Sequence, residues 1–145
     1  MTTLNTPQSV ASANPRQIHA GAVTRKFTYS VSASLSVGDV LELVKVPHGA
    51  IIEDVCIVRT GAGQFTGTIG DGGDADRFRT SATLVDGTVI QGINNSEGVG
   101  YQYDISDDAA VQFDTVDLTV TTVTSATATS TITGWVRYHC DEADV

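Results

Sequence analysis

Residues 37–60 (VGDVLELVKVPHGAIIEDVCIVRT) constrain the fold of this 145-residue chain most strongly. Two apolar runs, Val40–Val46 and Ile51–Val58, are rich in β-branched residues and are separated by Pro47-His48-Gly49. Proline cannot donate to a sheet ladder and glycine tolerates a positive φ, so this tripeptide predicts a turn or short connection. The two runs favour strands, and their near-alternate apolar spacing does not fit a helix. We therefore expect two core strands of an all-β domain.

The rest of the chain also favours short strands, and no convincing amphipathic helix occurs in it. Alternating apolar residues predict strands at Thr24–Leu35, Phe65–Ile69, Val99–Ile105, Val116–Thr124 and Thr129–Cys140. The segment Thr83–Ile90 is ambiguous, because Asp86-Gly87 inside it could form a hairpin turn. About eight to ten strands at spacings of ~8–12 residues imply antiparallel pairing. We expect an antiparallel two-sheet β-sandwich of jelly-roll type, with another Greek-key sandwich as the alternative.

Composition divides the chain into three segments. Residues 1–22 are polar, contain Pro7 and Pro15 and show no sustained period, so we expect an extended or flexible N-terminal arm. Residues 23–140 are expected to form the β-sandwich domain, and residues 141–145 an acidic tail. We expect no signal peptide and no membrane span, because no stretch approaches the ~18 consecutive apolar residues that a span needs.

Charge is distributed unevenly along the chain. The formal net charge is −9, but residues 1–38 carry Arg16, Arg25 and Lys26 and no acidic residue, so the remainder carries −12. An acidic body argues against nucleic-acid binding, which needs Lys and Arg to displace counterions from phosphates. It is compatible with solubility alone, and also with docking on a basic surface.

The Gly/Asp loop at residues 70–76 is the first candidate for chemistry. Asp71, Asp74 and Asp76 could offer oxygen ligands to a hard cation such as Ca²⁺. Their spacing does not match an EF-hand, and no glutamate follows at the required distance. We favour a turn region in which Asp bonds to the backbone and Gly supplies positive φ, so we expect no bound metal.

No other residues form a recognisable catalytic pattern. His19, His48 and His139 lack zinc spacing, no Gly-x-Ser-x-Gly elbow occurs, and Cys56 fits a small buried residue of a strand. A Cys–His dyad stays open from sequence alone. Trp135 fits either the core or an interface, and we favour core packing because large aromatic residues dominate cores. We expect a protein without enzymatic activity or cofactor.

Four sequence strings carry a resemblance to a known family. They are SASLSVGDVLELVKVPHGAIIEDVCIVRT, FTGTIGDGGDADRF, GYQYDISDD and VDLTVTTVTSATATSTITGWVRYH, which together span residues ~32–139. They resemble small structural proteins encoded in tailed-bacteriophage head gene clusters, which look like capsid cement or decoration proteins. The resemblance implies a jelly roll that sits as a dimer or trimer on the outer capsid shell. It implies the major capsid protein as partner and supplies no catalytic residues.

A location on the outer capsid surface of a virion, after synthesis in the host cytoplasm, follows from that resemblance. We expect residues 1–26 and one sheet edge to make the shell contacts, with Arg16, His19, Arg25 and Lys26 as candidate contact residues. One alternative is another virion β-module, such as a tail or head-fibre base protein. A carbohydrate-binding sandwich is a further alternative that would require exposed aromatic residues on one sheet face.

Overall fold

The computed structural model describes residues 2–5, 22–103, 113–125, 127 and 129–140. Within these ranges the chain forms nine β-strands and one short 3₁₀ helix, η1. Their bounds are β1 Thr3–Asn5, β2 Val23–Val31, β3 Val40–Pro47, β4 Ala50–Thr60, β5 Gln64–Gly70, β6 Arg79–Leu84, β7 Val89–Gln91, η1 Ser96–Gly98, β8 Phe113–Ser125 and β9 Ser130–Cys140. The expected all-β fold is confirmed.

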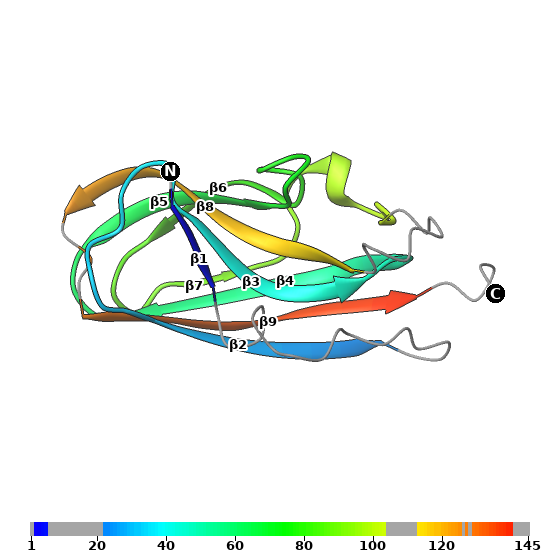
Figure 1. Ribbon diagram of the computed structural model, residues 1–145, viewed down its shortest axis with the longest axis horizontal. Helices are drawn as coiled ribbons and strands as arrows, with labels where there is room; N and C mark the ends of the chain where they lie inside the picture. The colour runs from blue at the N-terminus through cyan, green and yellow to red at the C-terminus, as the bar shows by residue number, and fades with distance from the viewer. Residues whose placement is uncertain (1, 6–21, 104–112, 126, 128, 141–145) are drawn as a thin grey trace.

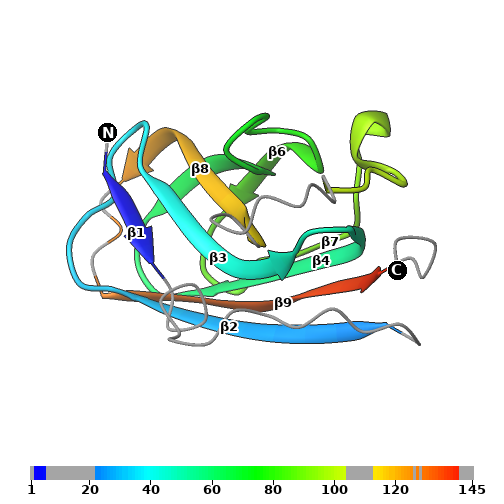
Figure 2. The same cartoon turned by 45° about the vertical axis from the view of Figure 1, so that its right-hand side comes forward.

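The strands form two layers that face each other across one core (Figures 1 and 2). One sheet has the order β1-β3-β8-β5-β6 and the other has the order β2-β9-β4-β7. Each sheet thus combines strands from both halves of the chain, as in a jelly roll, which confirms the expected two-sheet sandwich. All pairings are antiparallel except that of β1, which lies parallel to β3 and extends the edge of the first sheet.

The two strands predicted from residues 37–60 are β3 and β4, and they lie in opposite sheets. The connection at Pro47-His48-Gly49 carries the chain from one layer to the other, and Gly49 has a φ of 83°. A β-bulge interrupts the register of β3 between Glu42 and Val44. The short proline–glycine connection therefore joins the two layers at one end of the sandwich.

Alternation in β2 and β9 places their apolar residues in the core, as predicted. Phe27 and Val31 of β2 are buried, as are Ile132, Val136 and Tyr138 of β9. The two strands pair over the whole length of β2. The largest fully buried aromatic and aliphatic side chains come from both sheets and from the segment that precedes β6: Tyr138, Phe27, Phe65, Phe78, Leu41, Leu43, Ile52, Ile57, Ile69, Leu84 and Leu118.

One local prediction was wrong. The expected strand at Val99–Ile105 is absent from its described part, where only Gln102 forms an isolated bridge, to Ile51. Gly98 and Gly100 explain the difference, because Gly98 packs against the backbone of residues 77–78 and Gly100 has a φ of 73°. These glycines turn the chain and leave Val99 69% exposed.

The Asp86-Gly87 segment does form a turn, with Gly87 at a φ of 78°. The flanking strands β6 and β7 nevertheless belong to different sheets, so the turn is not a hairpin. It carries the chain across the sandwich instead.

Candidate interaction surface

The Gly/Asp loop is organised around Asp71. Its Oδ1 accepts hydrogen bonds from the backbone N–H groups of Gly73 and Asp74, both at 2.9 Å. Its Oδ2 lies 2.7 Å from Nε of Arg77, whose guanidinium also stacks on the ring of Tyr101 at 3.8 Å. Asp71 thus holds the turn together and already has a positive partner.

Asp74 and Asp76, the other two metal-ligand candidates, interact mainly with each other. A side-chain hydrogen bond between them lowers the pKa of Asp74 and raises the pKa of Asp76. Among the described residues, no group of three His, Cys, Asp or Glu side chains is arranged to hold a metal ion. The expectation that this loop binds no calcium stays a prediction that a melting experiment with added CaCl₂ can test.

The outer face of the second sheet carries Trp135, which is half-buried there and does not belong to the core cluster. The core expectation for Trp135 was therefore wrong. In the β2–β9–β4 ladder, Trp135 lies between Lys26 and Cys56. Arg137, also on this face, lies with its guanidinium 5.9 Å from the Trp135 ring.

A small ion-pair network continues this face toward the C-terminal end of β9. Glu53, at the bulge of β4, lies 3.4 Å from Nε of Arg137 and 3.2 Å from Nδ1 of His139. All three side chains are partly exposed, so each pair contributes little stability, about 0–1 kcal/mol. The network instead gives this face a mixed polar and aromatic character.

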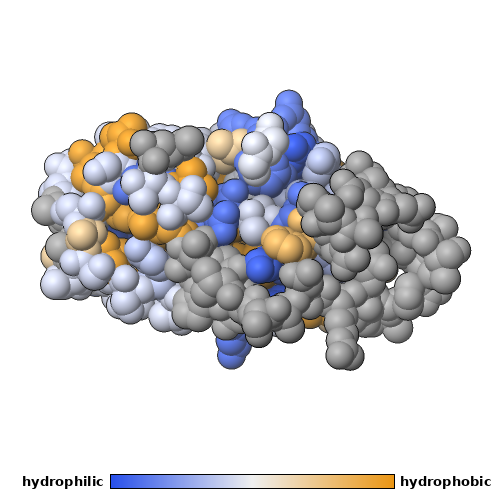
Figure 3. All heavy atoms as spheres, in the orientation of Figure 1, coloured by the Kyte–Doolittle hydropathy of each residue, from blue (hydrophilic) through white to orange (hydrophobic). Residues whose placement is uncertain are grey.

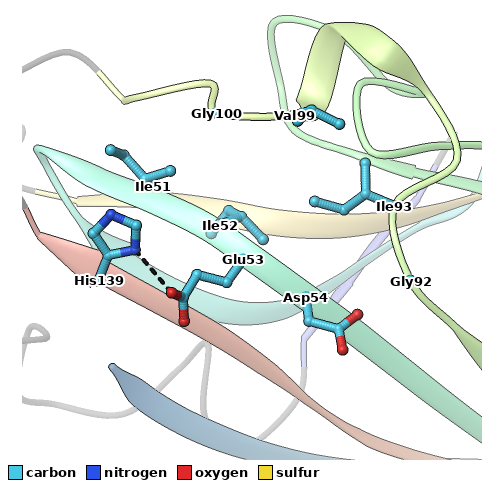
Figure 4. Close-up of a pocket in the computed structure, with 9 residues that line it drawn as sticks. All are labelled: Ile51, Ile52, Glu53, Asp54, Gly92, Ile93, Val99, Gly100 and His139. Atoms are coloured by element: carbon cyan, nitrogen blue, oxygen red, sulfur yellow. Dashed lines mark ion pairs between the residues drawn. The ribbon is translucent and has the colours of Figure 1, made fainter. Parts of the chain in front are cut away.

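An apolar groove of about 500 Å³ borders the network (Figure 4). Ile51 and Ile52 of β4 lie on one side, and Ile93 and Val99 of the loop after β7 lie on the other. His139 and Glu53 close one end, joined by the ion pair drawn in Figure 4. Apart from this partly exposed Glu53–His139 pair and Asp54, the lining residues carry no ionisable side chain, so the groove mainly offers an apolar contact surface.

A second apolar region lies at the opposite end of the molecule. Figure 3 shows apolar atoms gathered at the end where β1 begins. The loop between β2 and β3 lies at this end and carries Val37, which is 66% exposed, and Leu4 of β1 lines the same hollow of about 450 Å³. Exposed apolar atoms near strand ends suit contact with another protein surface.

The four candidate contact residues differ in what the structure says of them. Arg16 and His19 lie outside the described residues. Arg25 and Lys26 are neighbours on β2 and therefore face opposite sides of the sheet. Arg25 lies on the side of β2 that faces the core. Burial raises the pKa of the Tyr138 hydroxyl, and a hydrogen bond with Arg25 partly offsets this rise. Lys26 is exposed beside Trp135.

Sequence reasoning missed Arg59, which is fully buried at one end of the sandwich. Its guanidinium donates to the carbonyls of Ala62, Gly63 and Leu84 and lies 5.4 Å from the Phe65 ring centre. The burial of Arg59 could have been predicted from the alternation of β4, because Arg59 follows the inward-facing Val55 and Ile57 at every second position. These three hydrogen bonds join the β4–β5 turn to the end of β6, which indicates a structural role.

Fold and site together define a jelly-roll-like β-sandwich with candidate contact surfaces on its outer faces. No helix within the described ranges is long and apolar enough to cross a membrane. No protein-family model matches the sequence, and no curated protein matches it significantly.

Solved structures do match the fold. A chain of the capsid of Ralstonia phage GP4 matches with a TM-score of 0.73 at 14% identity, over 96% of this chain and 98% of that one. A chain of the cyanophage Pam1 capsid asymmetric unit matches with a TM-score of 0.60 at 16% identity, over 91% and 94% respectively. Both likenesses concern the whole sandwich.

Proposed function

We propose that this chain is a structural protein of a phage virion that binds the outside of the capsid shell and stabilises it, as a cement or decoration protein. The observation that supports this most is the near-complete coverage of both chains in the match to a phage capsid chain. A chain of a phage capsid that this chain matches over nearly its whole length therefore has the same overall fold. The proposal includes no catalytic role.

The negative net charge of the chain supports a position on the outer surface of the capsid shell. The net charge of −9 would repel packaged DNA if the protein lined the inside of the shell. On the outside, the same charge suits docking on basic surface regions of the major capsid protein, which we propose as its partner. Repeated weak contacts suffice for such a protein, because symmetry and oligomerisation engage many contacts at once.

The N-terminal region and β2 are the proposed shell contacts, with Arg16, His19, Arg25 and Lys26 as the contributing side chains. Within the described ranges β2 pairs only with β9, so it is an edge strand of its sheet. An edge strand of nine residues can take another strand or a neighbouring subunit. A dimer or trimer of this protein is part of the proposal.

Two truncations separate the contributions of β1 and of the rest of the N-terminal region. Removing residues 1–5 deletes β1, whereas removing residues 1–22 also deletes the segment that carries Arg16 and His19. Each protein is mixed with undecorated capsids, the particles are pelleted, and the bound copies are counted. We expect the full chain to bind in a number matched to the shell subunits, and the 1–22 deletion to lose far more occupancy than the 1–5 deletion.

Equal occupancy of all three proteins would refute the contact role of residues 6–22. A handful of bound copies per particle would indicate a tail or head-fibre base protein instead. Absence of binding, together with capture on a glycan array, would indicate a carbohydrate-binding sandwich.

A further inference from the structure

A pit of about 400 Å³ opens on the outer face of the first sheet. It lies between β1, β3, β8 and the Gly/Asp loop, and its lining includes Thr3, Glu42, Asp71, Thr115 and Asp117. This pit is distinct from the apolar groove at Ile51, which lies on the other sheet.

Asp117 is the most unusual residue of the pit. It is only 6% exposed, and its Oδ1 has no hydrogen-bond partner. Glu42 lies directly opposite it across the β3–β8 pair, so the two carboxylates share one face. On its other side Asp117 faces Gly70, which contributes no side chain. Two acidic side chains therefore lie adjacent, one of them buried.

No positive group among the described residues compensates this pair. Arg77 is paired with Asp71, and the other ion pairs join His48 to Asp114 and Glu53 to Arg137 and His139. Burial raises the pKa of Asp117 to about 7, with Glu42 and Asp71 adding to the effect and a hydrogen bond with Thr115 opposing it. A buried carboxylate with an acidic neighbour and no positive partner is stabilised by a proton or by a cation.

The geometry favours a long cationic side chain over a metal ion. No three acidic, His or Cys side chains within the described part of the chain are arranged around a common metal position, and Asp71 is engaged by Arg77. The volume is several times that of an ion, and Thr3, Thr115 and Thr119 on its walls carry hydroxyl groups that can accept further N–H bonds.

We propose that this pit receives a lysine or arginine side chain of the major capsid protein, with Asp117 and Glu42 as its counter-charges. This assignment rests on the proposed capsid function. An ion pair formed there is shielded from solvent and would anchor each subunit at a defined point.

The test measures the affinity for undecorated capsids of the full chain and of Asp117→Asn, Glu42→Gln and Asp86→Asn. Asp86→Asn is the matched control, because it removes one acidic charge at the exposed β6–β7 turn. At pH 8 we expect Asp117→Asn to weaken binding roughly tenfold or more, Glu42→Gln to weaken it less, and Asp86→Asn to change it less than about twofold.

The pH dependence gives a second readout. The charged groups near Asp117 are Glu42 on β3 and the Asp71–Arg77 pair in the loop after β5. The charge of Asp117 also helps to raise the pKa of the buried Tyr103. Protonation of Asp117 removes the counter-charge, so the affinity of the full chain should fall between pH 8 and pH 6, whereas that of Asp117→Asn should not.

Each outcome decides a different question. If the full chain binds capsids but Asp117→Asn binds equally well, the pit does not hold the anchor and the capsid function stands. If the full chain binds Ca²⁺ in calorimetry and Asp117→Asn does not, the pit is a metal site and the proposal is overturned. If the full chain does not bind capsids at all, the proposed function fails and the assigned occupant fails with it.

Discussion

Asp117 is a carboxylate whose ionisation opposes folding. Its ordinary pKa is 3.8, and burial raises the pKa to about 7 in the folded chain. Between these values the folded chain holds a proton that the unfolded chain has released, so the free energy of unfolding falls as the pH rises through this window. Above pH ~7 the cost is fully present, roughly 4 kcal/mol for a shift of this size.

The first prediction follows from this cost. Asp117→Asn removes the ionisable group and keeps a similar shape, so it should raise the free energy of unfolding by roughly 2–4 kcal/mol at pH 8. At pH 5 the carboxyl is protonated in the folded chain but mostly ionised in the unfolded chain, so a smaller difference of roughly 1.5 kcal/mol should remain. Urea unfolding at both pH values measures this, with Asp86→Asn as the control. An equal effect at both pH values would contradict the proposed ionisation.

Arg59 shows a different situation, a buried charge whose terminal nitrogens are hydrogen-bonded while its Nε has no partner. Burial lowers the pKa of its guanidinium, while three carbonyl oxygens accept its N–H groups. Those carbonyls belong to the β4–β5 turn and to the end of β6. Arg59 thus ties together the strand ends at one edge of the core.

Truncating Arg59 should therefore destabilise the fold strongly. Arg59→Ala leaves three carbonyls unpaired beside a cavity, and we expect a loss of about 3 kcal/mol in the free energy of unfolding. Arg59→Lys should lose less, because an ammonium replaces some but not all of these bonds. Chemical denaturation measures both variants; an alanine variant as stable as the parent would show that these bonds contribute nothing.

At the scale of elements, Gly134 sets how closely β9 packs against its neighbours. It pairs with Phe27 of β2 and Ile57 of β4. A Cβ at this position would overlap the carbonyl oxygen of Cys56 and lie 2.9 Å from Cζ of Phe27. The glycine is required by space, since two strands and an aromatic ring converge on it.

Gly134→Ala should consequently push β4 and Phe27 away from β9. We expect a loss of about 3 kcal/mol in the free energy of unfolding. Gly72→Ala is the control, because no atom lies within 4 Å of an added Cβ there, and it should change stability by less than about 0.5 kcal/mol. Thermal unfolding of the two variants side by side measures the contrast. Similar melting temperatures would mean that the sheet adjusts without cost.

The sequence predicted strands best where one face alternates cleanly. β2, β4 and β9 were foreseen because Phe27, Ile57 and Val136 stand in runs of inward apolar residues. The strand expected at Val99–Ile105 was wrong because local alternation does not show that Gly98 packs against a distant backbone. Which strands become neighbours depends on contacts far apart in sequence, so the parallel addition of β1 could not be foreseen.

The features of the outer faces were predicted less well than the fold. In β9, Trp135 belongs to one set of alternating residues and Val136 and Tyr138 to the other. Which of the two sets faces the core depends on tertiary packing, so the sequence alone could not show that Trp135 faces outward. The pit around Asp117 combines residues of two strands and a loop, and its character depends on Gly70 lying opposite. Lys26, which the acid-free N-terminal composition singled out, is exposed on the same face as Trp135, and its contact role stays a prediction.

At the scale of the whole molecule, the chain forms two layers with one shared core and places its distinctive groups on outer faces and at strand ends. The apolar groove, the Trp135 face and the Asp117 pit lie on different parts of this surface. Such a distribution suits a protein that touches several neighbours at once. The likeness to chains of two solved phage capsids concerns this same overall architecture.

Electron cryomicroscopy of undecorated capsids, imaged with and without added protein, tests the proposed role most directly. We predict that added protein appears as jelly-roll density on the outer shell surface, in a copy number set by the shell symmetry, with the Asp117 pit facing the capsid protein. Density confined to the tail vertex, density inside the shell, or unchanged particles would contradict the proposal.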